Sequence, residues 1–484
     1  MQFLKSTGGV YFSHMKKDSK YGALSKNTLL FTINSFGSKL ITFLLVPLYT
    51  NVLSTNDYGT ADLMTSTAQL LIPLLTLNIQ DAVLRFSLDK TKDPKKIISV
   101  GCTINSIAMC LLGVVLFLLS YFGILTFGKE YLIFLFFSFA FGGIQNSLQM
   151  YMKAVDNVKV LVYSGLASTL FSCVSNLLLL LVFKIGILGY LISNLVSHFV
   201  AILIMFFFGK IYRDVRFTTD VNLIKEMLIY SSPLAINSVA WWINTASDKY
   251  IITFFCGAAI NGIYSVAYKI PTILSTFQTI FYNAWSVSAI TEFDKEDKDG
   301  FIGNTYSLYM CVSTVGCSVI LIFNKILAGM LYAKDFYDAW QCVPFLLLGV
   351  AFNGIALFEG CLFTAVKKTK DVSRTTLVGA IVNTIANFAL IPFFNSIGAA
   401  FATMIGYFTV LLVRTISLQK IVRMKVNWKK SVICTILLGI QCFFALNQNV
   451  ITLSIQIFCL VMLLVLQYSS IKKVFLKMAS RLKK

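Results

Sequence analysis

Three ionisable side chains interrupt the otherwise apolar stretch of residues 245–274. Asp248 and Lys249 are neighbours in "TASDKYIITFF", and Lys269 follows in "SVAYKIPTIL". Ammonium groups attract anions such as phosphates, and a carboxylate can take up and release a proton or a metal cation. Which of these chemistries applies depends on whether the stretch lies in water or in lipid.

The composition of the chain places this stretch in lipid. The chain has 484 residues, of which 57% are hydrophobic and 13% are charged, and its mean hydropathy is +0.77. Soluble domains carry about 25% charged residues. Lipid offers no partner to backbone polar groups, so spanning segments must be helices or closed barrels, and apolar runs of about 20 residues without alternation favour helices. The sequence therefore predicts an all-α polytopic membrane protein.

Apolar runs between charged or Gly, Asn and Pro positions predict about fourteen transmembrane helices. Their predicted limits are 27–52, 60–86, 98–122, 131–153, 160–183, 186–209, 223–256, 261–290, 302–324, 340–365, 375–393, 397–419, 430–447 and 450–470. Basic segments such as "KTKDPKK" alternate with loops such as "NVLSTNDYG" that carry no Lys or Arg. This bias predicts both termini in the cytoplasm, with the chain in the plasma or inner membrane.

A weak internal repeat relates the two halves of the chain. Placing Gly59 on Gly262, an offset of 203 residues, aligns the first two predicted spans with the seventh and eighth. Six spans followed by six in the same orientation are typical of transporters that hold their substrate between the halves. The predicted organisation is a basic cytoplasmic segment at 1–26, an N-lobe at 27–220, a C-lobe at 221–425, two further helices at 426–470 and a basic cytoplasmic tail at 471–484.

Ionisable groups inside the predicted spans cost about 2.5–3.5 kcal/mol each at the bilayer centre on insertion scales, so each is expected to meet a partner or water. The candidates for a functional role are Lys39, Asp62, Asp81, Arg85, Asp248, Lys249, Lys269 and Glu359. At about 1.5 Å of rise per residue, Lys249 and Lys269 lie at one level, roughly 10–12 Å below the turn that joins their spans. Lys39 lies near the midplane of its span.

Each of these charges has a structural interpretation beside the functional one. Adjacent residues on a helix diverge by about 100°, so Asp248 and Lys249 need different partners. Asp81 and Arg85 have the i, i+4 spacing of an intrahelical ion pair. Asp62 is near the predicted outer interface, where solvation can satisfy it. The lysines either line a hydrated cavity or snorkel and pair structurally.

The remaining functional groups give no sign of enzyme or nucleic-acid chemistry. The net charge of +20 is spread over short cytoplasmic segments, so we attribute it to topology and anionic lipids rather than to nucleic acid. The eleven cysteines show no C-x-x-C spacing, and no cofactor or metal is expected. His198 is expected to be a hydrogen-bonded interior residue. No connection is long enough for a catalytic domain, which argues against an enzyme.

Residues 230–285, "YSSPLAINSVAWWINTASDKYIITFFCGAAINGIYSVAYKIPTILSTFQTIFYNAW", resemble polysaccharide repeat-unit flippases of the multidrug/oligosaccharidyl-lipid/polysaccharide exporter superfamily. So do residues 27–59 and "LYAKDFYDAW" at 331–340. The resemblance covers nearly the whole chain. It implies two six-helix lobes around a central V-shaped cavity, plus two extra C-terminal helices.

The resemblance also implies a function. Such flippases move an undecaprenyl-pyrophosphate-linked oligosaccharide from the cytoplasmic to the outer leaflet by alternating access, for O-antigen or capsule assembly. Implied partners are this lipid-linked substrate, membrane lipids, H⁺ or Na⁺, and a polysaccharide polymerase with other assembly proteins. Because the family's cavities are cationic, the implied substrate-binding residues are Lys39, Lys249, Lys269, Asp248 and Arg85. The ion-coupling candidates are Asp62, Asp81, Asp248 and Glu359.

Three alternative functions stay open. A cation-coupled small-molecule exporter of the same fold is expected to favour acidic cavity residues, whereas this chain offers lysines. A lipid II-type flippase differs only in its substrate. A membrane glycosyltransferase, ligase or polymerase normally carries a large extramembrane region, which is not evident here.

Overall fold

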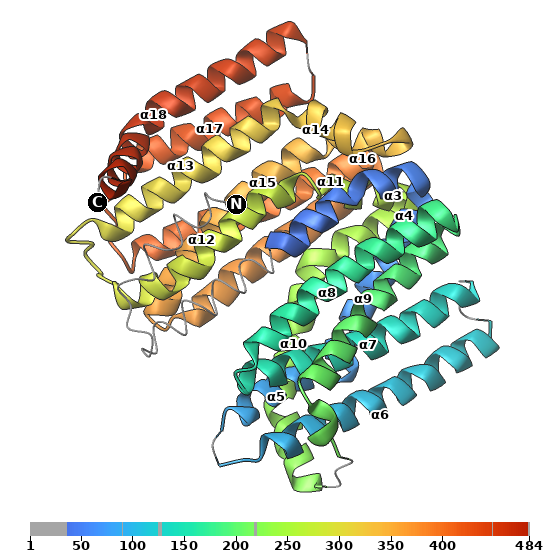
Figure 1. Cartoon of the computed structure of the whole chain (residues 1–484). Coiled ribbons are helices and arrows are strands. Elements are labelled where there is room, and N and C mark those ends of the chain that lie inside the picture. Colours follow the sequence, from blue (N-terminus) through green and yellow to red (C-terminus); the bar gives the residue numbers. More distant parts are fainter. Residues whose placement is uncertain (1–35, 90, 124–127, 217–219, 448, 483–484) are drawn as a thin grey trace. The chain divides into compact units, whose positions relative to one another are not determined.

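The computed structural model describes residues 36–482, apart from residues 90, 124–127, 217–219 and 448 (Figure 1). Within these residues the regular structure is helical throughout. An apolar helix at Phe36–Val52 includes α3 (Val46–Val52). The next elements are α4 (Thr55–Leu75), α5 (Ile79–Ser87), α6 (Pro94–Tyr121), α7 (Lys129–Ala154), α8 (Val158–Leu177), the π-helix η1 (Leu178–Val182), α9 (Gly186–Phe208) and the 3-10 turn η2 (Ile211–Arg213).

The second half of the chain continues the same pattern. Its elements are α10 (Val221–Cys256), α11 (Ala258–Ala267), α12 (Pro271–Thr291), α13 (Phe301–Ile322), α14 (Asn324–Leu331), the 3-10 segment η3 (Lys334–Gln341), α15 (Val343–Ala365), α16 (Thr369–Gln419), α17 (Trp428–Ala445) and α18 (Val450–Leu482). The all-α, multi-pass prediction is confirmed.

The described helices account for most of the predicted spans. Nine are long and apolar enough to cross a membrane, and the count is ten if the bent pair α4 and α5 forms one span. One of the nine, α16, consists of two helices, because Asn395 has φ 51° and ψ −133° in its middle. This break lies between the predicted spans 375–393 and 397–419. The total of fourteen stays a prediction, since the first predicted span begins outside the described residues.

Particular residues end and bend the helices. Leu77 and Asn78 have positive φ angles, and the axes of α4 and α5 meet there at 57°. Gly257, with φ 88°, separates α10 from α11 in a conformation that favours glycine. Pro271 is the first residue of α12, where its missing N–H costs no helical bond. The eighth predicted span is therefore two helices, with Lys269 in the link between them.

The chain divides into two compact units that do not follow one cut in the sequence. The first unit holds the described residues up to Leu45 and those from Met64 to Trp241, and the second holds Val46–Leu63 and the residues from Trp242 onward. The start of α4 therefore belongs with the second half of the chain. The predicted lobe limits at residues 220 and 425 stay predictions.

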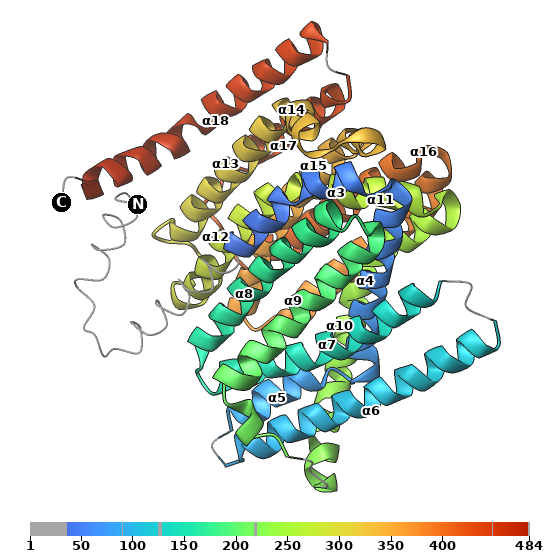
Figure 2. The same cartoon turned by 45° about the vertical axis from the view of Figure 1, so that its right-hand side comes forward.

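In the first unit, α5, α6, α7 and α9 share one apolar core. Its buried members include Val83, Ile97, Met152 and Met205. In both views α8 and α9 run side by side, and α6 lies along α7 (Figure 2). At one end of this unit Lys95 pairs with Asp214 at 2.9 Å.

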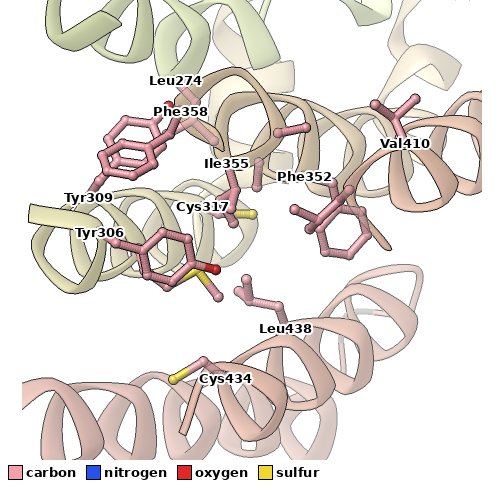
Figure 3. Packing of buried hydrophobic residues seen from close by; sticks show 14 of the residues in the cluster. Leu274, Tyr306, Tyr309, Cys317, Phe352, Ile355, Phe358, Val410, Cys434 and Leu438 are labelled. Carbon is pink, nitrogen blue, oxygen red and sulfur yellow. The ribbon is translucent and has the colours of Figure 1, made fainter. Parts of the chain in front are cut away.

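In the second unit, aromatic side chains hold α12, α13 and α15 together. The rings of Trp285 and Phe358 stack with centroids 4.2 Å apart, and Trp285 donates its Nε1–H to the Phe358 carbonyl at 3.1 Å. Tyr306, Tyr309 and Phe358 lie in one buried cluster with Leu438 of α17 (Figure 3). This dense packing gives the second unit a rigid frame on which polar groups can be placed.

Candidate functional site

Asp248 of α10 is the centre of a buried polar cluster in the second unit. Only 4% of this residue is exposed. Its carboxylate accepts hydrogen bonds from the Tyr264 hydroxyl at 2.8 Å, the Thr403 hydroxyl at 2.7 Å and the Asn387 amide at 2.6 Å. With the Asn383 amide in the orientation that satisfies its neighbours, its nitrogen also donates to Asp248, at 3.1 Å. Asp248 is thus held by neutral groups from α11 and from both halves of α16.

This arrangement has the chemistry of a site for a proton or a small hard cation. Among the described residues no Lys or Arg lies within 4.0 Å of the Asp248 carboxylate. The Oδ1 atom of Asn387 is buried and accepts no hydrogen bond from any described residue. Carboxylate, amide and hydroxyl oxygens are the ligands that hard cations prefer. In the described part of the chain, no three His, Cys, Asp or Glu side chains are grouped to hold a metal.

Lys249, the neighbour of Asp248, faces a different partner. Its ammonium lies 3.0 and 2.9 Å from the two carboxylate oxygens of Asp62 in α4. Asp62 also accepts a hydrogen bond from the Ser265 hydroxyl of α11 at 2.7 Å. The prediction that Asp248 and Lys249 need separate partners is confirmed. The interpretation of Asp62 as merely solvated is wrong, because the start of α4 packs on α11 and brings its carboxylate to Lys249.

Lys269 lies in the short link between α11 and α12, just before Pro271. It is half-buried, and Asp62 attracts its ammonium electrostatically. Its side chain makes no hydrogen bond to any residue that the structure describes. Two lysines on successive parts of the chain are therefore drawn to a single carboxylate.

The other predicted cations belong to the first unit. Lys39 is exposed on the helix Phe36–Val52, and Arg85 is exposed in the last turn of α5. The predicted ion pair between Asp81 and Arg85 is not formed. Asp81 instead accepts a hydrogen bond from the Asn78 amide at 2.6 Å, because the left-handed conformation of Asn78 turns this side chain toward the first turn of α5. His198 is hydrogen-bonded to Gln145 at 2.5 Å, as expected of an interior histidine.

Glu359 of α15 is fully buried beside a second buried charge. One of its oxygens accepts a hydrogen bond from Thr415 at 2.8 Å, and the other has no partner among the described residues. Arg414, which attracts Glu359, donates to the Ala356 carbonyl and the Thr376 hydroxyl, both at 2.8 Å. The carboxylate and the guanidinium therefore share a polar pocket of backbone and hydroxyl groups.

Several of these residues were not singled out from the sequence. Arg414 carries a recognisable signal, since it is a cation inside the predicted span 397–419. Asn387, Thr403 and Tyr264 carry none, because neutral polar residues are common in spans. Only their shared contact with Asp248 identifies them.

Comparison with known proteins gives a family. Residues 24–288, more than half of the chain, match a family described as polysaccharide biosynthesis protein. The chain is 22% identical over 219 residues to the probable low-salt glycan biosynthesis flippase Agl15 of Haloferax volcanii, and this match covers 44% of the chain and 46% of that protein. It is also 22% identical over 281 residues to the capsular polysaccharide biosynthesis protein CapF of Staphylococcus aureus, covering 54% of the chain and 71% of that protein. The chain thus spans less than half of Agl15.

Solved structures give the fold. The lipid II flippase MurJ in an inward closed conformation matches with a TM-score of 0.68 at 15% identity, over 93% of this chain and 100% of that one. An inward-facing multidrug resistance MATE family transporter matches with a TM-score of 0.59 at 11% identity, over 80% of this chain and 94% of that one. This multi-pass helical chain therefore shares its fold with MurJ and the MATE transporters, and it belongs to the polysaccharide biosynthesis protein family.

Proposed function

We propose that this protein is a flippase for an undecaprenyl-pyrophosphate-linked oligosaccharide repeat unit. It moves the unit from the cytoplasmic to the outer leaflet of the cell membrane, where a polymerase and other assembly proteins extend the surface polysaccharide. In this proposal both termini are cytoplasmic, and the N- and C-lobes alternate in access to the two sides. The family, the flippase and exporter fold, and the glycan-related names of the relatives support it.

The observation that carries the proposal is the sharing of Asp62 by two lysines. Lys249 and Lys269 are partly shielded from solvent and are drawn to this one carboxylate. A pyrophosphate cannot enter hydrocarbon without replacing its lost hydration, and a sugar adds to that cost. Two ammonium groups at one depth supply that replacement. Lys39 and Arg85, two of the exposed cations of the first unit, are proposed as further contacts for the headgroup.

Asp248 is the proposed coupling group. Since it precedes Lys249 in the chain, its negative charge opposes the binding of an anion at Lys249. A proton or Na⁺ taken up by the Asp248 cluster removes this opposition, so the cation and the anionic headgroup favour each other's binding. Such favourable coupling between two sites is reciprocal. Glu359, with one unpartnered oxygen among the described residues, is a second proposed proton site, and Asp62 and Asp81 complete the proposed coupling groups.

The proposed function is tested by complementation. Cells that lack this gene should regain surface polysaccharide with the wild-type protein but not with the Lys249→Ala, Lys269→Ala double variant. Lys298→Ala, which removes an exposed loop lysine, is the matched control and should complement fully. Abundance in the membrane should be equal for all three proteins. Normal surface polysaccharide from the double variant would remove the proposed anion site.

The match to MurJ favours lipid II transport as a second candidate, because the headgroup chemistry is the same. Cells depleted of their own lipid II flippase distinguish the two substrates. Growth rescued by this protein would assign lipid II, whereas restored surface polysaccharide without such rescue supports the first proposal.

A further inference from the structure

The two copies of the internal repeat touch each other at equivalent positions. A Cβ atom built on Gly59 of α4 would lie 1.9 Å from the carbonyl oxygen of Ala258, and one built on Gly262 of α11 would lie 2.0 Å from the carbonyl oxygen of Thr55. Thr55 and Ala258 are related by the same offset in sequence as the two glycines. The contact is therefore reciprocal. The first turns of α4 and α11 can pack this closely only because both glycines lack a side chain.

Two hydrogen bonds lie beside this contact, and one of them joins two residues that are related by the same offset of 203 positions. The buried amide of Asn261 donates to the Gly59 carbonyl at 3.0 Å. Ser265 and Asp62, which occupy equivalent positions in the two repeats, are joined at 2.7 Å. Lys249 then binds Asp62 from α10. We call the set of Gly59, Gly262, Asn261, Ser265, Asp62 and Lys249 the repeat contact.

The repeat contact is of a kind that separates at small cost. Glycine-lined helices approach closely, but they interlock no side chains across the contact. The polar bonds described above comprise one neutral hydrogen bond, from Asn261 to the Gly59 carbonyl, one hydrogen bond to a carboxylate, from Ser265 to Asp62, and the ion pair of Lys249 with Asp62. The side chains of Lys249 and Asp62 are 21% and 23% exposed, so the protein does not fully enclose the pair.

The contact involves the helix ends that the proposed topology places at the outer side. Residues 46–63 belong to the second unit, whereas the described residues on both sides of this segment belong to the first. The segment is therefore held to the second unit by the repeat contact, by Thr50 bonded to the Leu331 carbonyl at 2.9 Å and by Lys334 bonded to the Asn51 carbonyl at 2.6 Å.

We propose that the repeat contact is the outer gate and that Asp62 acts as an internal substitute for the substrate's phosphate. This inference rests on the proposed function. Asp62 occupies Lys249 while the gate is closed. A phosphate that binds Lys249 and Lys269 displaces Asp62 from Lys249. Of the two contacts of Asp62 described above, only the hydrogen bond from Ser265 then remains. The phosphate also repels the Asp62 carboxylate, since two anions a few ångströms apart oppose each other. The start of α4 then leaves α11, and the outer side opens.

The test measures access to the repeat contact in the full-length protein in lipid nanodiscs. Asn261→Cys places a thiol at a fully buried position in the contact, and Cys256→Ala removes the nearby native thiol. A water-soluble maleimide should label Cys256→Ala, Asn261→Cys slowly, and undecaprenyl pyrophosphate should raise the rate several-fold, whereas undecaprenol should not. Inorganic pyrophosphate distinguishes a headgroup effect from a lipid effect. Ser54→Cys, at an exposed position before α4, should be labelled rapidly under all conditions.

The Asp62→Asn variant tests whether the Asp62 carboxylate is the group that competes with the phosphate for Lys249. This change should raise the labelling rate without ligand and strengthen the binding of undecaprenyl pyrophosphate, because Lys249 then has no competing carboxylate. A purely structural Asp62 would lower the melting temperature without strengthening binding. Thr55→Cys is a second reporter for the case in which Asn261→Cys does not fold.

The outcomes separate this inference from the proposed function. If undecaprenyl pyrophosphate binds but labelling at 55 and 261 stays constant, the gate is refuted and the flippase proposal stands. If binding of undecaprenyl pyrophosphate is absent in wild type and in Asp62→Asn, both are refuted.

Discussion

Lys249 of α10 and Asp62 of α4 form an ion pair at 2.9 Å although 187 positions separate them in the chain. The pair joins the two sequence repeats within one compact unit. Asp248, the residue before Lys249, instead accepts hydrogen bonds from Tyr264, Asn387 and Thr403, so two adjacent residues have separate sets of partners.

The ion pair should show energetic coupling. Lys249→Gln leaves Asp62 without its cation and should destabilise the protein by roughly 1–2 kcal/mol, intermediate between exposed and buried pairs. Asp62→Asn added to Lys249→Gln should cost little more, since the second charge is then already unpaired. Thermal unfolding in detergent, followed by tryptophan fluorescence, gives the double-mutant cycle. Strictly additive losses would show that the two charges do not interact.

The glycines of the repeat contact should tolerate no added carbon. Gly59→Ala and Gly262→Ala each place a Cβ about 2 Å from a backbone oxygen, which cannot rotate away. Both variants should reduce surface polysaccharide strongly and favour maleimide access at Asn261→Cys. The matched control is Gly329→Ala in α14, where a Cβ meets nothing within 4 Å. This control should keep full activity and gain up to about 1 kcal/mol in stability from its higher helix propensity.

Asp248→Asn should uncouple transport from the ion gradient. The amide has nearly the shape of the carboxylate but cannot take up a proton and holds a cation weakly. Vesicles loaded with lipid-linked oligosaccharide should show wild-type transport that rises with an inward proton or Na⁺ gradient, and Asp248→Asn transport that is low and insensitive to both. Tyr264→Phe, which removes only one of the hydroxyl donors, should keep the gradient response. Wild-type transport unchanged after ionophores collapse both gradients would contradict the coupling role.

Asp297 should stabilise the second unit from a connecting loop. This residue is 1% exposed, and its carboxylate accepts the backbone N–H groups of Ile302 at 3.0 Å, Gly303 at 2.9 Å and Lys425 at 3.0 Å. Asp297→Ala leaves these donors unpaired and should cost about 2–3 kcal/mol. The melting temperature in detergent measures the loss. Asp299→Ala, at an exposed position in the same loop, should leave the melting temperature unchanged.

The sequence predicted most of the helices, because apolar runs of this length follow from local composition. It also singled out Asp248, Lys249 and Lys269 as charges inside apolar segments. It also aligned Gly59 with Gly262. It did not predict that these glycines touch, since an alignment of repeats says nothing of the packing between them.

Other parts of the site depend on tertiary contacts that no local pattern encodes. Asn387 and Thr403 come together at Asp248 because α16 breaks at Asn395. The sequence predicted this break, between the spans 375–393 and 397–419, but it did not indicate which side chains would meet across it. For Asp81, the local pattern predicted a contact that the structure does not form. Its i, i+4 spacing to Arg85 is correct for a pair, but the turn at Asn78 supplies a nearer donor.

The assignment of residues 46–63 to the second unit has a consequence for biosynthesis. These residues are synthesised long before α10 and α11, so residues 46–63 can pack against the second unit only after those helices have been made. A gene split after residue 220 should therefore work only when both fragments are made together, because the first fragment carries a piece that completes the second.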